Sequence, residues 1–404
     1  MENNILFIIE ELGDITSSAA ISRFNLCKTV ASTHKNCTIL TLDNISERVK
    51  NEWSNYGNLF VHPKNNIKRY QKPLMYFDKV RGLIYTVLGN NFDHYNRIKN
   101  IRYFLKKQGN QFDTIFLLSG GFGFSPHQAI RKFKNLKETK IISFIHDPYP
   151  ISCYPEPYRR GSKIKDFFKI KNLQNNFTLS NFIVYPSQKL YEWYLNDYQI
   201  AKEKVRIIPH AVDRHQVDDK NYIPKNNKVI VHAGTLLEAR NPKVFLDVFQ
   251  KVKLENFEIN FYGGINAKVK DQIKIYEPNE NINFVAKRIP YKKALEKLYY
   301  ADFLLLIESN GKNSPFLPTK FVDYVNSGKP IIVLSPKNSE VSRLLGTQYP
   351  FVSELDNAEK IEEILMYKIK DLKLLDLANS KIEELKKYFS KENISSLYTE
   401  IINN

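Results

Sequence analysis

Residues 313–333 read NSPFLPTKFVDYVNSGKPIIV, and this stretch decides the fold of the second half of the chain. It predicts a turn, a short helix that begins near Pro318 and stops at Gly328, and then a buried strand, because proline suits the first helical turn and glycine suits a helix end. The first turn of a helix presents unpaired N–H groups and a partial positive charge, which favour a phosphate. Asp323 would lie about one turn further along, within reach of sugar hydroxyls attached to that phosphate.

Outward from this stretch, apolar runs alternate with polar helical stretches along the whole chain, which predicts α/β domains with parallel sheets. Doubly wound sheets bind their ligands at the carboxyl ends of the strands, so two such domains would form a crevice there. The polar segment 213–227 contains Pro224 and predicts a linker between the domains. We expect strands at 4–9, 38–42, 114–118, 140–145, 182–185, 229–233, 258–262, 282–285, 303–307 and 331–334. We expect helices at 18–32, 91–107, 126–133, 188–195, 242–252, 291–300 and 358–370, and one or two in 380–404.

Length and composition bound the class of protein. The 404 residues predict two or three domains, and 43% hydrophobic residues with 13% aromatics exclude a disordered chain. The formal charge of +17 favours an anionic partner such as nucleic acid, acidic lipid headgroups or a phosphorylated substrate. A merely solvated basic surface explains the charge equally well.

Cysteine usage and the chain start indicate the compartment. Cys27, Cys37 and Cys153 lack metal or redox spacing and suggest buried thiols in a reducing compartment. The apolar run 5–9 ends at two glutamates and predicts a first strand rather than a signal peptide. No apolar run approaches the ~20 residues that span a bilayer. We expect a cytoplasmic protein, with peripheral attachment to the inner face of the plasma membrane as an open alternative.

Further motifs accompany the 313–333 stretch in a fixed order. They are IIPHAVD at 207–213, VIVHAGTLLEARNP at 229–242, FYGG at 261–264, FVA at 284–286 and LYYAD at 298–302. The ordered set resembles the donor site of GT-B-fold glycosyltransferases, close to glycosyltransferase family four. The likeness is good over about residues 180–345 and loose in the N-terminal half.

The resemblance implies a GT-B fold with two Rossmann-like domains facing a central cleft. Residues 1–212 would bind the acceptor, residues 213–380 would bind the nucleotide-sugar donor, and a C-terminal helix in 381–404 would cross back onto the first domain. It implies transfer from a nucleotide-diphosphate sugar, such as a UDP- or GDP-sugar, to a saccharide or lipid-linked acceptor in the synthesis of capsule, O-antigen or lipopolysaccharide. No resident cofactor is implied.

Three side chains carry most of the implied donor site. Arg240 stands where the family has a lysine that contacts the diphosphate, and its fork suits phosphate oxygens. Lys320 lies in the first turn of the predicted helix, where a cation is unfavourable unless an anion is bound. Asp323 aligns with the glutamate that contacts the ribose. Each also has a plain interpretation as a solvated surface residue. The other donor-side candidates are Gly234, Thr235, Gly263, Ser314, Phe316, Leu317 and Thr319.

Two departures from the family pattern bear on the mechanism. Thr235 stands where the family often has a second arginine, and Pro315 stands where the first motif glutamate belongs. Glu308 is the nearest acid and is a candidate replacement, although it equally suits a structural acid at a strand end. We expect retaining transfer, with an inverting outcome as the alternative because of Pro315.

In the first domain, His146 and Asp147 follow a predicted strand and are candidates for sugar contact or proton transfer. Gly13, Thr16 and Ser17 follow the first strand, where the family has a loop near the diphosphate and acceptor. Ser17 also suits a helix cap. No Asp-x-Asp pair or His/Cys cluster has ligand spacing, so we expect no metal.

Two other classes compete with a transferase. The departures at Thr235 and Pro315 favour a non-catalytic GT-B-like subunit that binds glycan or partners an active transferase. Nucleic-acid binding rests on charge alone, since no recognisable reading module is present, and we expect no nucleic-acid partner.

Overall fold

The computed structural model of the chain describes residues 3–10, 12–13, 17–61, 92–119, 124–131, 138–211, 227–287 and 289–404. The chain divides into two compact units. Unit 1 comprises 1–154, 158–211 and 391–404, and unit 2 comprises 155–157 and 212–390. Most of the predicted linker 213–227 lies outside the described residues.

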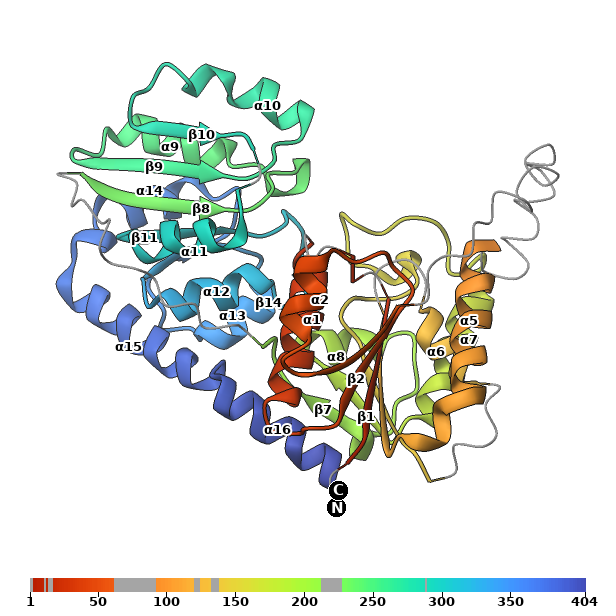
Figure 1. The fold of residues 1–404 in the computed structure, drawn as a ribbon. Coiled ribbons are helices and arrows are strands. Elements are labelled where there is room, and N and C mark those ends of the chain that lie inside the picture. Colours follow the sequence, from red (N-terminus) through yellow and green to blue (C-terminus); the bar gives the residue numbers. More distant parts are fainter. Residues whose placement is uncertain are drawn as a thin grey trace. The chain divides into compact units, whose positions relative to one another are not determined.

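Unit 1 is built on a seven-stranded sheet with the order β3-β2-β1-β4-β5-β6-β7, in which every pair is parallel (Figure 1). Its central strands are fully buried apolar runs, as expected for strands covered on both faces. The strands are β1 Ile5–Ile9, β2 Cys37–Thr41, β3 Gly57–Val61, β4 Thr114–Leu118, β5 Lys140–Phe144, β6 Phe182–Tyr185 and β7 Val205–Ile207.

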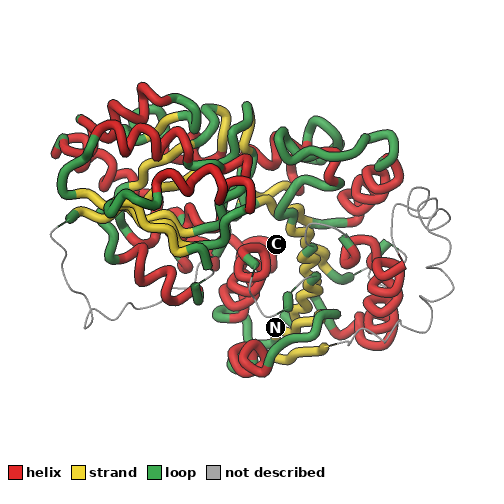
Figure 2. Tube along the Cα trace, turned by 90° about the horizontal axis from the view of Figure 1, so that it is seen from above, coloured by secondary structure: helices red, strands yellow, loops and turns green. Residues whose placement is uncertain are grey.

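Helices cover both faces of the unit 1 sheet (Figure 2). Ile394, Tyr398 and Ile401 of the last helix pack in one core with Phe24 of the first helix and Phe116 of the sheet. The C-terminal helix therefore returns to the first unit, as predicted. The helices are α1 Ser18–Ala31, α2 Glu47–Trp53, α5 Phe92–Gln108, α6 Ser125–Ile130, α7 Phe167–Leu179, α8 Gln188–Tyr194 and α16 Lys391–Asn403.

Unit 2 contains a six-stranded parallel sheet with the order β10-β9-β8-β11-β13-β15 and a two-stranded sheet of β12 and β14. A single hydrophobic core fills the unit. The strands are β8 Lys228–Ala233, β9 Phe257–Tyr262, β10 Ile282–Val285, β11 Phe303–Ile307, β12 Asn313–Ser314, β13 Ile331–Leu334, β14 Asn338–Ser339 and β15 Val352–Ser353. The helices are α9 Lys243–Val252, α10 Ala267–Ile273, α11 Tyr291–Tyr299, α12 Thr319–Ser327, α13 Glu340–Leu345, α14 Ala358–Met366 and α15 Leu372–Tyr388.

Both large sheets are doubly wound, and the predicted α/β class is correct. In unit 1 the strand order reverses between β1 and β4, and in unit 2 it reverses between β8 and β11. Ligands of open parallel sheets bind at the carboxyl ends of the strands beside such a reversal. The topology therefore points to one crevice in each unit.

Candidate active site

Two glycine loops meet at the carboxyl end of β8 in unit 2. Gly234 directly follows β8 with a φ of +154°, and its N–H donates to the Tyr262 carbonyl at 2.8 Å. Gly263 follows β9 with a φ of +141°, and a Cβ there would lie 2.3 Å from the Gly234 oxygen. The chain of the first loop therefore passes close to Gly263. This close passage brings the two loops together without side chains between them.

Lys320 of α12 and His232 of β8 both lie next to Gly234. A Cβ on Gly234 would lie 3.1 Å from Lys320 Nζ and 3.5 Å from His232 Nε2. The His232 Nδ1 bonds the Leu305 carbonyl at 2.9 Å, and a carbonyl only accepts, so Nδ1 carries the proton. Burial holds the pKa of His232 well below its usual range, with Lys320 adding to the effect, so the ring is neutral. The buried Nε2 has no hydrogen-bond partner among the described residues and is an acceptor.

The surroundings of Lys320 bring its pKa close to neutral pH. This half-buried side chain on the first turn of α12 donates to the Ile307 carbonyl at 3.5 Å. Burial, together with repulsion by Arg240, lowers the pKa of Lys320 to about 7, although Glu308 acts in the opposite direction. Two cationic side chains thus repel each other at a helix N-terminus. A bound anion would relieve both the repulsion and the unfavourable position of Lys320.

Arg240 is held beside this position by backbone contacts. It ends a short 3₁₀ turn, Glu238–Arg240, and its N–H donates to the Leu237 carbonyl at 2.8 Å. The Asn310 N–H donates to the Ala239 carbonyl at 2.8 Å, which joins the loop after β8 to the loop after β11. The neighbouring Thr235 is exposed. Arg240 is close enough to Lys320 to lower its pKa, so the structure brings these two predicted site residues together.

Glu308 is the buried acid of the site. It follows β11, is 4% exposed, and accepts hydrogen bonds from Ser314 Oγ at 2.7 Å and from Ser335 Oγ. Burial raises its pKa, while the two serines, Arg240 and Lys320 oppose that shift. The Ser314 hydroxyl donates its proton to Glu308 and cannot also donate it to a phosphate. Of the donor groups of Ser314, a candidate residue for the donor site, only the backbone N–H is left for a phosphate. Glu308 is thus a buried counter-charge to Lys320 and Arg240.

Two tyrosines hold the middle of α12 in place. The Tyr324 hydroxyl accepts a 2.8 Å bond from the Ala233 N–H, which pins the helix to the end of β8. Tyr291, the first residue of α11, donates a 2.7 Å bond from its hydroxyl to Asp323 Oδ1. Burial raises the pKa of Asp323 to about 7, although the bond from Tyr291 opposes the shift. Of the other candidates, Leu317 and Thr319 are buried and Phe316 is half-buried in the turn before the helix.

In unit 1, His146 lies just beyond β5 and its ring centroid is 4.8 Å from that of His210. Burial lowers the pKa of His146 to about 3, and Arg23 adds to the effect. His210 bonds Ser22 Oγ at 2.8 Å through Nδ1. The Asp147 carbonyl accepts a 2.8 Å bond from the Tyr194 hydroxyl, which fixes the loop after β5.

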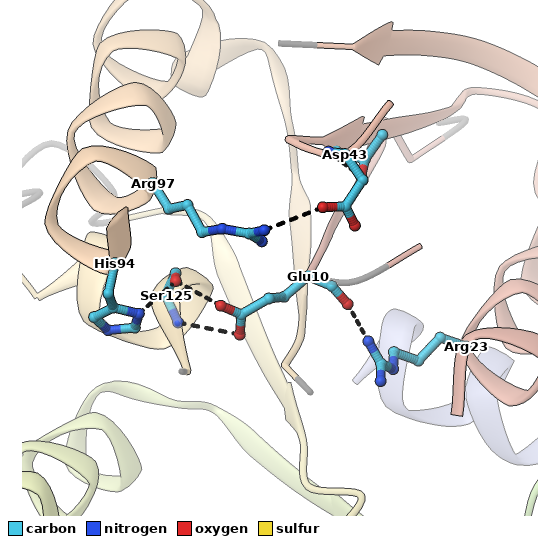
Figure 3. Close-up of polar contacts among 7 residues, drawn as sticks. Glu10, Arg23, Asp43, His94, Arg97 and Ser125 are labelled. Carbon is cyan, nitrogen blue, oxygen red and sulfur yellow. Dashed lines mark hydrogen bonds and ion pairs between the residues drawn. The ribbon is translucent and has the colours of Figure 1, made fainter. Parts of the chain in front are cut away.

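A second polar cluster lies at the carboxyl ends of β1 and β2 (Figure 3). Glu10, directly after β1, accepts bonds from Ser125 Oγ at 2.6 Å and Ser125 N at 3.3 Å. His94 Nδ1 lies 2.9 Å from the same Ser125 hydroxyl, so it donates there, because that hydroxyl gives its proton to Glu10. The Glu10 backbone carbonyl accepts a hydrogen bond from Arg23. None of these residues was a candidate from the sequence, because no motif joins them.

The loop after β1 is only partly described. Gly13 has a φ of +49°, and Thr16 lies outside the described residues. Ser17 accepts the Ala20 N–H at 3.1 Å and caps α1, which is the role its position predicts. Its side chain is therefore engaged locally.

Within the described ranges, no group of three or more His, Cys, Asp or Glu side chains is placed to hold a metal ion. No helix in those ranges has the length and hydropathy needed to cross a bilayer.

The family match covers part of the chain, and the similar solved structures cover nearly all of it. Residues 60–216 match the family described as Glycosyltransferase Family 4. This match lies mostly in unit 1, whereas the motifs that carried the resemblance lie mostly in unit 2. No curated protein matches the chain in sequence.

Several solved structures share the fold over the whole chain. The glycosyltransferase from Rickettsia africae ESF-5 is 15% identical, with a TM-score of 0.68 over 99% of this chain and 98% of that one. Anabaena Alr3699/HepE in complex with UDP-glucose is 11% identical, with a TM-score of 0.64 over 99% of each chain. A point mutant of S. aureus TarM, in complex with fondaparinux, alpha-GlcNAc-glycerol and UDP, is 11% identical, with a TM-score of 0.67 over 100% of each chain. The chain has the GT-B fold of glycosyltransferases, and the resemblance read from its sequence is confirmed.

Proposed function

We propose that the protein transfers a sugar from a nucleotide-diphosphate sugar to a saccharide or lipid-linked acceptor, with the donor bound in unit 2. The observation that carries this proposal is the convergence of Lys320, Arg240 and the N-terminus of α12 on the open end of β8 at Gly234. Two cations and a set of helix N–H groups match a pyrophosphate. The structures of HepE with UDP-glucose and of TarM with UDP support this assignment by analogy.

Each group has a role in this proposal. Arg240 and Lys320 stabilise the charge that develops on the nucleotide diphosphate as the bond from the anomeric carbon to the phosphate oxygen breaks. Glu308 keeps the two cations in place through its charge. Asp323, held by Tyr291, accepts hydrogen bonds from the ribose hydroxyls. The neutral His232 Nε2 accepts a hydrogen bond from Lys320 or from a donor hydroxyl.

The acceptor belongs to unit 1 in this proposal. The new bond joins the acceptor oxygen to the anomeric carbon, and the nucleotide diphosphate leaves with the electron pair. In retaining transfer the leaving phosphate takes the acceptor proton. In the inverting alternative a base such as Asp147 or His146 takes it, although burial lowers the pKa of His146 to about 3 and makes its ring a weak base. We propose that the reaction is metal-independent, with the two cations supplying the charge that a metal supplies in other transferases.

The broader setting is the synthesis of a surface polysaccharide, by a cytoplasmic protein that associates peripherally with the membrane. The saccharide ligands of TarM support a saccharide acceptor by analogy. A lipid-linked acceptor would place the reaction at the membrane face. The positive charge of the chain suits such a place.

The test is a panel of UDP- and GDP-sugars screened by thermal shift, followed by nucleotide release in the presence of EDTA. We expect one donor to stabilise the protein, with about 2.7 kcal/mol at 100 times its Kd. Nucleotide release that depends on acceptor would establish the transferase. Stabilisation without turnover by the isolated protein would favour the non-catalytic subunit, which the departures at Thr235 and Pro315 suggest. No stabilisation by any nucleotide would sink both.

A further inference from the structure

Unit 1 presents apolar side chains to solvent at the start of α7. Ile164 is 87% exposed, Phe167 56% and Phe168 50%. The two phenyl rings contact each other edge to face, with centroids 5.6 Å apart. Single exposed apolar residues are common, but a cluster of large ones marks an interaction surface.

A rigid platform holds these side chains. The Phe167 N–H donates to the Ile164 carbonyl at 3.3 Å, and Asp166 between them is buried. Asp166 accepts from Ser152 Oγ at 2.7 Å and pairs with Lys169 at 2.7 Å. In the loop before α7, the Arg160 N–H donates to the Ile151 carbonyl at 3.4 Å, which links the two ends of residues 151–160. We name the exposed residues Ile151, Ile164, Phe167 and Phe168 the Ile164 patch.

Basic side chains surround the Ile164 patch. Residues 158–171 contain six lysines and arginines and one acid, Asp166. That acid is neutralised by Lys169, and the nearby Asp197 pairs with Lys163. Lys171 follows Phe167 by four residues on α7 and so lies on the same helix face. The exposed members of this basic rim are Arg159, Arg160, Lys163, Lys165 and Lys171.

We propose that the Ile164 patch and its basic rim dock the protein on the surface of an anionic lipid bilayer. Ile and Phe side chains offer no hydrogen-bonding group, which suits the boundary between headgroups and acyl chains rather than a polar partner. The surrounding cations complement acidic headgroups. Only the biological role of this docking rests on the proposed function: it would bring a transferase to a lipid-linked acceptor.

Two other basic segments of the N-terminal half lie at 64–72 and in α5. The segment 64–72 lies outside the described residues. In α5, Arg97 pairs with Asp43 at 3.2 Å, and Arg102 donates to the Ala129 and Gln128 carbonyls at 3.1 Å. These two arginines are engaged within unit 1, and the exposed cations of α5 are Lys99, Lys106 and Lys107.

The experiment is co-sedimentation of the full chain, without donor or acceptor, with phosphatidylcholine vesicles and with vesicles that also contain phosphatidylglycerol. We expect binding to the phosphatidylglycerol vesicles that weakens with salt. I164S/F167S/F168S should abolish it. R160Q/K165Q/K171Q should weaken it by roughly 100-fold, since each cation near such a surface contributes about fivefold.

Matched variants control for net charge and for general loss of apolar surface. K99Q/K106Q/K107Q removes the same charge from α5, and Y367S/L372S/L377S removes three exposed apolar side chains from unit 2. Both controls should bind like the parent chain. Equal loss in a control and its patch variant, or patch variants that bind normally, overturns the proposal. Binding to heparin or nucleic acid but not to vesicles also overturns it.

The two proposals fail separately. Donor-induced thermal stabilisation should be unchanged in the patch variants, because they leave unit 2 untouched. If no nucleotide sugar stabilises any of the proteins but the vesicle results hold, the transferase proposal fails and membrane docking stands. The opposite pattern leaves the transferase and removes the docking surface.

Discussion

The hydroxyl of Tyr324 on α12 accepts the backbone N–H of Ala233 at the end of β8, at 2.8 Å. The same hydroxyl lies 3.3 Å from the Ala233 carbonyl and 3.4 Å from the Leu305 carbonyl of β11. One buried group thus ties α12 to both strands at the reversal point of the sheet. We expect the position of Lys320 relative to Gly234 to depend on this tie.

Tyr324→Phe tests that dependence. The change leaves the Ala233 N–H without its partner, so we expect a loss of about 1–3 kcal/mol in the free energy of unfolding. It should also weaken donor affinity, because the helix and the Gly234 loop are no longer held together. Urea unfolding and titration with the stabilising nucleotide sugar measure the two effects.

Tyr349→Phe is the matched control. The Tyr349 hydroxyl likewise accepts a backbone N–H at 2.8 Å, from Ile331, but at the amino end of β13. We expect a similar loss of stability with normal donor affinity. If both variants weaken the donor equally, the tie at Ala233 has no special role.

Gly263→Ala tests the close passage of the two glycine loops. Its Cβ would lie 2.3 Å from the Gly234 carbonyl oxygen, at a φ of +141° that side chains rarely adopt. We expect at least about 2 kcal/mol of destabilisation from overpacking and backbone strain. Gly264→Ala is the adjacent control, because its Cβ would meet nothing closer than Thr235 Cγ2 at 3.7 Å. Equal melting temperatures for the two variants would contradict the expected clash.

Arg240→Ala should abolish most donor binding and turnover, since it removes a charged pair of donors from the diphosphate. Arg240→Lys should restore only part of the affinity, because an ammonium lacks the planar fork. Lys243→Ala, three residues on, removes an exposed cation that pairs with Asp247 at 2.7 Å and should have no effect on the donor. Near-normal turnover in Arg240→Ala would exclude the donor site proposed for this loop.

Sequence periodicity predicted the buried parts of the fold closely. Strands such as Phe303–Ile307 and Ile331–Leu334 have the predicted bounds because both faces are covered and every residue is apolar. The edge strand Gly57–Val61 was missed, since its side chains alternate between half-buried and exposed and it begins with glycine. The whole of α7, Phe167–Leu179, was missed because exposed Phe and Lys residues in its first turns obscure the helical period.

The sequence predicted those site residues that lie within a recognisable motif. Arg240, Lys320 and Asp323 each lie in a recognisable stretch, so spacing located them. His232, Tyr291 and Ser335 were missed because their roles arise only from packing between elements. Tyr291, for example, meets Asp323 across 32 residues of chain, through the contact of α11 with α12.

Donor binding should be coupled to proton uptake at Lys320. Its pKa of about 7 leaves most Lys320 side chains neutral at pH 8. A bound pyrophosphate raises that pKa, so UDP binding should take up close to one proton at pH 8 and almost none at pH 6. Calorimetry in buffers of different ionisation enthalpy measures the uptake. Lys320→Met should remove it, while Lys312→Met, which changes an exposed lysine in the loop after β11, should not.

Asp323 should make the stability of the protein depend on pH. Burial raises its pKa from 3.8 to about 7, so between these values the folded state holds a proton that the unfolded state has released. Raising the pH through this window therefore lowers the free energy of unfolding, by up to about 4 kcal/mol above pH 7. Asp323→Asn carries no such charge and should be more stable than the parent at pH 8 but not at pH 4.

The same variant should bind donor less well at pH 8, because an amide replaces a carboxylate at the ribose hydroxyls. Higher stability together with weaker donor binding would show that the buried Asp323 carboxylate serves ligand binding at a cost in stability. Thermal melts from pH 4 to 8, with and without the nucleotide sugar, separate the two effects. Asp376→Asn changes an exposed acid on α15 and should shift neither. A stability difference between Asp323→Asn and the parent that stays constant over this range would show that the carboxyl does not titrate in the window.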